Sequence, residues 1–345
     1  MKILLYSDVH WEERSSIVVQ EGKKYTLRLE NLIKCVNWAQ DLAVKEKCSA
    51  CISLGDFFDK PVLTDQEITA LQDIHWNPAI KNYFLVGNHC SSVNDLRYSS
   101  MSIVAGPNRE VISKPEVKQF DSLEVCFLPY IVESIRKPLA EYFPKANKKR
   151  LILSHNDIKG FNFGGLLSKT GFTIPEIEND CDLYINGHLH LGSKLTDKVI
   201  NIGNLSGKDM SENADKYPHR VIIIDTEDLM NYKSIENPYS LNFYKFSIDA
   251  EKDLDKCLHL KDNAVLYITV KDHLVNKLKD LLAEQANIIT YRLVLSHELA
   301  DEKEVQADAQ DLRLDYLAKF SECCHNKLEH TKILEEELAK VCAQQ

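Results

Sequence analysis

Five short segments of the sequence place acidic, amide and imidazole side chains directly after apolar runs. They are Asp8-Val9-His10, Gly55-Asp56-Phe57-Phe58-Asp59, Gly87-Asn88-His89, His155 after the run 151–154, and Gly187-His188-Leu189-His190. Carboxylate and imidazole together suit Mn, Fe or Zn, whereas Mg prefers oxygen ligands alone. Two divalent ions that share a bridging carboxylate can polarise a phosphate and activate a water molecule. The residue types therefore predict a two-metal hydrolytic site.

Each segment by itself has an ordinary structural explanation. An Asp-x-His or Gly-Asp pair after a strand is usually a solvated turn, and a histidine at a strand end is more often simply hydrogen bonded. However, Asp-x-His and His-x-His place alternate side chains on the same side of an extended segment. Five such endings in one chain predict that the side chains gather on one rim of a sheet, where open α/β folds bind their substrates.

Short apolar runs supply the strands that must position these side chains. The runs cover 3–7, 50–54, 83–86, 123–128, 150–154, 183–186, 199–202 and 220–224. Apolar residues at helical spacing between 27 and 42 predict a helix, and Thr64-Asp65-Gln66-Glu67 has the pattern of a capping box at the start of a second. Strand–helix alternation followed by closely spaced strands predicts an α/β fold built as a layered sandwich.

A change of pattern near Asn237-Pro238 divides the chain. We predict a main domain over residues 1–240 and a small α/β cap over 241–300, with strands at 243–249, 264–270 and 288–295 around a helix at 272–286. Residues 301–345 are charged and predicted to be helical. A helix with regularly spaced apolar residues needs a surface that buries them, either on its own chain or on a partner.

Composition limits the class of protein. The 345 residues are 44% hydrophobic and 27% charged, as in a soluble globular protein. No apolar stretch approaches the roughly 20 residues of a membrane span, and the N-terminal run is too short for a secretory signal. We therefore expect a cytoplasmic protein, in the host cytoplasm if it is viral, with the lone Cys48-Ser49-Ala50-Cys51 as packed thiols. The net charge of −10 argues against coating nucleic acid electrostatically, but not against acidic groups that hold cations.

In this order the five segments resemble the motifs of the calcineurin-like metallophosphoesterases, which are D-x-H, GD-x-x-D, GNH-(D/E), H and GH-x-H. The resemblance implies a β-sandwich flanked by helices and two divalent metal ions. The implied metal ligands are Asp8, His10, Asp56 and His190 for the first ion, with Asp56 bridging, and Asn88, His155 and His188 for the second. His89 matches the general acid or electrostatic stabiliser, and Asp59 matches a supporting position.

Cys90 departs from that pattern, because the family has Asp or Glu after GNH. The missing carboxylate ordinarily orients the histidine, and a thiol with a pKa of about 8.5 is mostly neutral at pH 7. We expect that Cys90 is not a nucleophile and that His89 is oriented by another acceptor, either a backbone carbonyl or Asp95. The substitution bears on rate and pH optimum rather than on metal binding.

Within the family, MKILLYSDVHW and GDFFDKP resemble the double-strand-break-repair nucleases, such as bacterial SbcD and bacteriophage recombination exonuclease subunits. The resemblance covers residues 1–225 by motif and the rest more loosely. It implies Mn²⁺-dependent cleavage of DNA, on duplex ends and single strands, by the nuclease subunit of an SMC-like ABC ATPase complex in recombination, repair or replication. The C-terminal helices would bind the ATPase, and helices near 27–46 and 64–77 would form a homodimer.

Three segments are candidates for contact with DNA. Trp11 either packs on a sugar or base or fills the core, residues 201–206 lie after the GH-x-H strand, and Lys148-Lys149-Arg150 is either a phosphate contact or a solvated loop. Two other functions are open: a small-substrate phosphodiesterase or nucleotidase, and a catalytically weakened scaffold. The cap and helical tail count against the former, and the complete ligand set counts against the latter.

Overall fold

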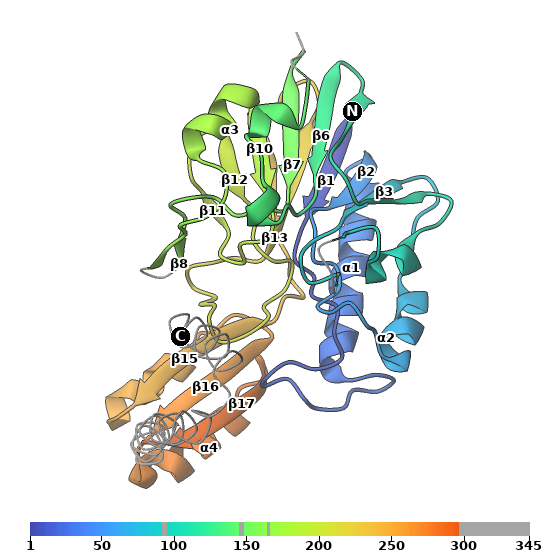
Figure 1. Ribbon diagram of the computed structural model, residues 1–345. Coiled ribbons are helices and arrows are strands. Elements are labelled where there is room, and N and C mark those ends of the chain that lie inside the picture. The colour runs from blue at the N-terminus through green and yellow to red at the C-terminus, as the bar shows by residue number, and fades with distance from the viewer. Residues whose placement is uncertain (92–94, 145–147, 164–165, 297–345) are drawn as a thin grey trace, which may run out of the picture.

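The computed structural model describes residues 1–296 except 92–94, 145–147 and 164–165. Its first sheet contains β1 (Lys2–Tyr6), β2 (Cys48–Ser53), β3 (Lys81–Leu85), β4 (Arg109–Ile112), β13 (Arg220–Asp225) and β14 (Lys233–Glu236), in the order β14-β13-β1-β2-β3-β4. The second contains β5 (Glu116–Phe120), β6 (Leu123–Leu128), β7 (Arg150–Ser154), β10 (Leu183–Asn186), β11 (Ser193–Lys194) and β12 (Val199–Asn201), in the order β11-β12-β10-β7-β6-β5. The two sheets form the layered α/β sandwich that the sequence predicts (Figure 1).

The alternation of side chains along β1 shows how the sequence builds these layers. Ile3 and Leu5 point into a core that they share with Leu153 of the second sheet. Leu4 and Tyr6 point the other way, into a core beneath the helices. Because successive side chains of a strand face opposite sides, a strand buried on both faces has a continuous apolar run, which is why the run at residues 3–6 is easy to recognise.

Helices cover the outer faces of the sandwich. The first sheet carries α1 (Leu27–Lys45) and α2 (Asp65–Ala70), and the second carries α3 (Ile174–Asp180). The predicted capping box is confirmed, since Thr64 Oγ1 accepts from Glu67 N at 3.2 Å and Thr64 N donates to Glu67 Oε2 at 2.9 Å. α2 ends sooner than predicted, because a 3₁₀ turn at Leu71–Asp73 follows it.

Some elements carried too little local signal for the sequence to predict them. β5 and β14 are edge strands of polar composition, and β4 and α3 are short. A two-stranded ribbon, β8 (Asn162–Phe163) and β9 (Leu166–Leu167), is also new. None of these supplies a predicted site residue, so the omissions leave the position of the site unaffected.

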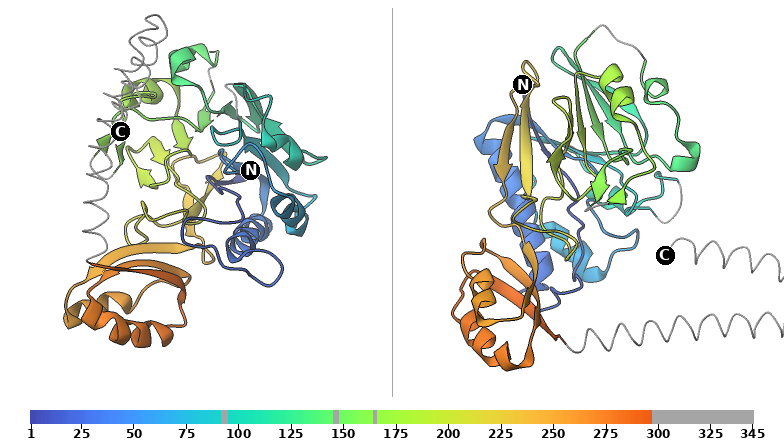
Figure 2. Two further views of the ribbon diagram at one scale, coloured as in Figure 1. Left: turned by 60° about the horizontal axis from the view of Figure 1, so that its bottom comes forward. Right: turned by 90° about the vertical axis from the view of Figure 1, so that its left-hand side faces the viewer.

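A third, parallel sheet forms the cap beside the sandwich, with β15 (Asn242–Ile248), β16 (Ala264–Val270), β17 (Ile288–Leu295) and the helix α4 (Val275–Ala283). The predicted strands lie within one residue of these bounds. Ile17 and Val18 of the main body pack against Leu241 and Phe243, which seats the cap beneath the sandwich (Figure 2). The predicted helical segment 301–345 lies outside the described residues. Among the described helices, none has the length and apolar character to cross a membrane.

Candidate metal centre

The five ligand-bearing segments meet at one end of the sandwich. β1, β2 and β3 run parallel, as do β7 and β10, so each set of carboxyl ends lies together. Backbone pairing continues beyond the strands, because Asp8 N donates to Gly55 O at 3.2 Å and His10 N donates to Asp56 O at 3.0 Å. The Asp-x-His and Gly-Asp segments are thereby held side by side, as the sequence predicts for residues on a shared rim.

The backbone at this rim is strained. Four of the predicted ligands have positive φ, namely Asp8 (49°), His10 (47°), Asp56 (42°) and His188 (69°). For residues with a Cβ this conformation costs on the order of 1–3 kcal/mol each and persists only where the surrounding structure enforces it. The motif glycines allow close packing here, since a Cβ at Gly55 would overlap His155 and one at Gly87 would overlap Asp56.

Asp8, His10 and His190 form the first candidate metal group. His10 Nε2 and His190 Nε2 lie 2.8 Å apart, and Asp8 Oδ1 lies 3.7 Å from the former and 4.0 Å from the latter. Asp8 Oδ1 is buried and makes no hydrogen bond with a described residue. Three ligand atoms that surround one point, with one carboxylate oxygen lacking a partner, fit a bound cation.

Asp56, His155 and His188 form the second group. Asp56 Oδ2 lies 3.1 Å from His155 Nε2, and Asn88 Oδ1 lies 3.3 Å from the same nitrogen. The structure therefore brings all seven predicted ligands into two adjacent clusters, with the mixed oxygen and nitrogen donors that transition metals favour. The individual ligand roles, including the bridging role of Asp56, remain predictions.

In three of the four candidate histidine ligands one ring nitrogen lies within hydrogen-bond distance of an acceptor, and in His190 the nearest carboxylate is farther away. The pairs are His10 Nδ1 with Asp59 Oδ1 at 2.7 Å, His155 Nδ1 with Leu54 O at 2.8 Å, His188 Nε2 with Asp157 Oδ1 at 3.3 Å, and His190 Nδ1 with Glu212 Oε1 at 3.7 Å. Such partners orient metal-binding histidines and set their tautomers. The second nitrogen of each ring is then the one available to an ion.

The ionisable groups of the first cluster differ in the charge that their surroundings favour. Burial alone would lower the pKa of His10, but its hydrogen bond with Asp59 and the nearby carboxylates of Asp8 and Asp56 raise it to about 9. Burial, together with the neighbouring His10, lowers the pKa of His190 to about 3. Burial opposes ionisation of Asp8, yet His10 and the nearby histidines hold the pKa of its carboxyl well below the usual range. An anionic Asp8 beside a neutral His190 is a suitable pair of ligands.

His89 lies beside the first group and is more exposed than the three residues of that group. Its ring is 5.0 Å from that of His10, and its side chain is 38% exposed. His89 Nδ1 lies 3.0 Å from the backbone carbonyl of Asp59, which leaves Nε2 for a substrate. Burial and the charge of His10 lower the pKa of His89. Of the two acceptors expected for His89, the backbone carbonyl is the correct one.

Cys90 has no part in that orientation. Its side chain is fully buried, with Sγ 3.6 Å from Phe58 O, and burial raises the pKa of the thiol far above its usual value. The expectation that Asp95 orients His89 is wrong, because Asp95 Oδ2 is 2.6 Å from Arg97 instead. A protonated, enclosed thiol agrees with the expectation that Cys90 is not a nucleophile.

Three functional residues were missed by sequence reasoning, namely Asp157, Glu212 and Lys208. Lys208 Nζ forms an ion pair with Asp59 and lies 3.2 Å from His10 Nδ1. His10, Asp59 and His89 are also close enough to form a third metal group, but the ammonium of Lys208 already supplies positive charge there. All three missed residues lie outside the recognised motifs, so no local spacing identified them.

The structure does not support the candidate DNA contacts. Trp11 is fully buried, donates Nε1–H to Glu67 O at 3.0 Å and stacks on Phe57, so it fills the core. Residues 201–206 are buried as well. Lys148-Lys149-Arg150 lies at the amino end of β7, whereas the candidate ligands follow its carboxyl end, so the basic run is remote from the site.

Comparison with known proteins agrees with this geometry. The family model for calcineurin-like phosphoesterases matches residues 1–192, which is more than half of the 345-residue chain. A search of curated proteins found no match. Members of this family hydrolyse phosphoester bonds with two divalent metal ions, and the matched region contains both ligand groups. The chain therefore belongs to the calcineurin-like phosphoesterase family of metal-dependent hydrolases.

Proposed function

We propose that this protein is a two-metal nuclease that hydrolyses DNA phosphodiester bonds. The observation that carries the proposal is the pair of ligand groups on one rim, with the partly exposed His89 next to them. Two divalent ions bound there would polarise the phosphate and lower the pKa of an attacking water. We infer Mn²⁺ as the metal from the resemblance to the repair nucleases, and the imidazole and carboxylate ligands, which suit Mn, Fe or Zn, agree with it.

The chain's own residues divide the remaining work. His89 donates a proton from Nε2 to the leaving oxygen, or stabilises the charge that develops there, while its Nδ1 stays on the carbonyl of Asp59. The carboxylate of Asp59 holds His10, and Lys208 neutralises that carboxylate. Asp59 therefore links the proposed acid, His89, to the candidate metal ligand His10. The positions of both histidine rings depend on the segment that carries Asp59.

A DNA substrate is favoured over a small ester by the motifs of the repair nucleases and by the cap beside the rim. A small-substrate phosphodiesterase has less need of a cap. The overall net charge of −10 would repel DNA at long range, so local cations must provide the attraction.

The proposed partners follow from the same family branch. Residues 301–345 would bind an SMC-like ABC ATPase, and helices near 27–46 and 64–77 would form a homodimer. Within the latter region, α2 leaves Ile68 40% exposed, and Ile103 nearby is 42% exposed. These apolar side chains suit a contact between copies better than the largely buried face of α1.

The test is cleavage of end-labelled linear duplex DNA in Mn²⁺ by the full chain, with bis(4-nitrophenyl) phosphate as a small diester. We expect both substrates to be cleaved by the wild type and neither by Asp56→Asn. Hydrolysis of the small diester alone, with an ATPase partner supplied, would favour the small-substrate enzyme. Failure on both substrates by a protein with bound metal would indicate a scaffold.

A further inference from the structure

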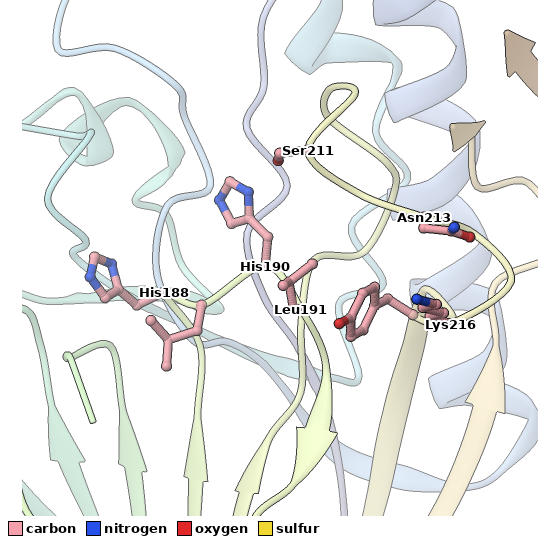
Figure 3. A pocket seen from close by; sticks show the side chains of 8 residues that line it. His188, His190, Leu191, Ser211, Asn213 and Lys216 are labelled. Carbon is pink, nitrogen blue, oxygen red and sulfur yellow. The ribbon is translucent and has the colours of Figure 1, made fainter. Parts of the chain in front are cut away.

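A groove of about 470 Å³ opens directly from the candidate metal centre. Figure 3 shows its lining, where both GH-x-H histidines lie opposite side chains from a single loop: His188, His190, Ser211, Asn213, Lys216 and Tyr217. This volume is within the range of about 300–1,000 Å³ that holds small ligands. The wall opposite the histidines belongs to residues 207–217, which we call the bridging loop.

The bridging loop is fixed to both the metal centre and the cap. The buried carboxylate of Glu212 accepts from Lys208 N at 3.2 Å and from Asn204 Nδ2 at 2.7 Å. At the cap, Ala214 is buried in the core and its N–H donates to Phe243 O at 3.2 Å. A wall held in this way is preformed, so a ligand need not order it.

The groove presents hydrogen-bond donors that have no partner among the described residues. Lys216 is exposed and its ammonium forms no ion pair there, in contrast to Lys208, which is paired with Asp59. The Nδ2 group of Asn213 has no described partner either, whereas Ser211 hydrogen bonds with Asp209. Tyr217 adds an aromatic ring to the lining of the same groove. Unpaired donors with an aromatic surface match a nucleotide, which combines a phosphate anion with a flat base.

The groove also lies on a definite side of the reacting phosphate. The rings of His89 and His190 both lie near that of His10, with centroids 5.0 Å and 4.6 Å from it, and the groove is lined by His190 but not by His89. His89 acts at the leaving oxygen in the proposed function. The groove therefore flanks the part of the substrate that keeps the phosphate.

We propose that this groove binds the nucleoside that retains the cleaved phosphate, with its base against Tyr217 and the adjacent phosphate at Lys216. The proposal rests on the proposed function and identifies residues that distinguish a nucleic acid from a small diester. It places substrate recognition on the bridging loop, outside the five metal-binding segments.

The first experiment uses esters that share one leaving group. The 4-nitrophenyl esters of thymidine 5′-phosphate and 3′-phosphate place a nucleoside on the retained side, whereas bis(4-nitrophenyl) phosphate does not. We expect wild-type kcat/KM to favour one nucleoside ester over the small diester, and Tyr217→Ala to reduce that ratio about tenfold through lost stacking. The control is Tyr291→Ala, which removes an exposed tyrosine of β17.

The second experiment measures the binding of labelled oligothymidylate against salt concentration in Ca²⁺. Lys216→Gln should weaken binding and reduce the slope of log K against log salt by about 0.7, as for one lost phosphate contact with a single strand. The control is Lys233→Gln, because Lys233 lies on β14 and is paired with Glu46.

The outcomes distinguish a failure of the proposed nucleoside groove from a failure of the proposed nuclease activity. Wild-type DNA cleavage with the ester ratio and salt slope unchanged in both variants would overturn the groove and leave the nuclease intact. Absence of DNA cleavage by the wild type would overturn the nuclease, and the groove with it.

Discussion

The metal-ligand rim and the bridging loop lie side by side but are built differently. Asp8, His10 and His155 on the rim are fully buried, and their backbone or ring positions are fixed by several partners. Ser211 and Lys216 on the loop have exposed side chains. The difference indicates that the metal-ligand side chains are held in place by several partners, whereas the exposed side chains of the bridging loop can be replaced with little cost to the fold. Substitutions of the metal-ligand residues should therefore reduce metal binding and hydrolysis more than substitutions of the residues around them.

The largest effect is expected from Asp56→Asn. Changing a residue that supports a metal ligand costs about 10- to 100-fold in affinity, and loss of a ligand should exceed that. We expect loss of bound metal, measured by elemental analysis after dialysis, together with loss of hydrolysis. Asp95→Asn is the matched control, because Asp95 pairs with Arg97 and does not reach His89. A fully metallated Asp56→Asn variant would contradict the ligand assignment.

His89→Gln should separate catalysis from metal binding. Metal content should stay at the wild-type level, while kcat for DNA falls by roughly 10²- to 10⁴-fold, the usual contribution of an acid catalyst. The loss should be smaller with 4-nitrophenyl esters, because a nitrophenolate leaves without a proton. Equal losses on both substrates would show that His89 stabilises charge rather than donating a proton.

Glu212→Ala tests whether the bridging loop also supports the metal centre, because Glu212 lies on that loop and its carboxyl group lies near His190. It removes the acceptor of Lys208 N and Asn204 Nδ2 and the carboxylate behind His190. We expect metal affinity to fall about tenfold and unfolding free energy to fall by about 1–3 kcal/mol from unpaired buried donors. Metal titration and thermal unfolding measure these changes, with Glu236→Ala on β14 as the exposed control. Unchanged metal affinity would mean that the loop acts on substrate alone.

The smallest effect is expected from Cys90→Ala. The side chain is buried but does not orient His89, so kcat should stay near the wild-type value while stability falls by about 1 kcal/mol. Cys90→Asp, which restores the family residue, should instead reduce activity, because Cys90 Sγ is only 4.0 Å from Asp56 Oδ1. Improved activity in Cys90→Asp would show that the Asp59 carbonyl is a poor substitute for the family carboxylate.

Prediction from the sequence succeeded where a signal was local. The capping box at Thr64 and the continuous apolar run of β1 each depend on neighbours within a few residues, and both are confirmed. Prediction left two alternatives open for Trp11, because its residue type suits contact with a base as well as packing in a core, and the structure shows the second. Its burial depends on Glu67 and Phe57, which come from other segments. The carbonyl that orients His89 was one of two alternatives, because thirty residues separate His89 from Asp59.

The sequence by itself determined which ligand types the centre contains, because each strand ending and the ligands that follow it lie within one short consecutive segment. Those segments predict which side chains meet at the rim. Only the tertiary structure decided what holds them, since Asp157, Lys208 and Glu212 reach the site from loops without periodic patterns. The groove likewise exists only because the bridging loop is fastened to the cap at Ala214, a contact between segments distant in the chain.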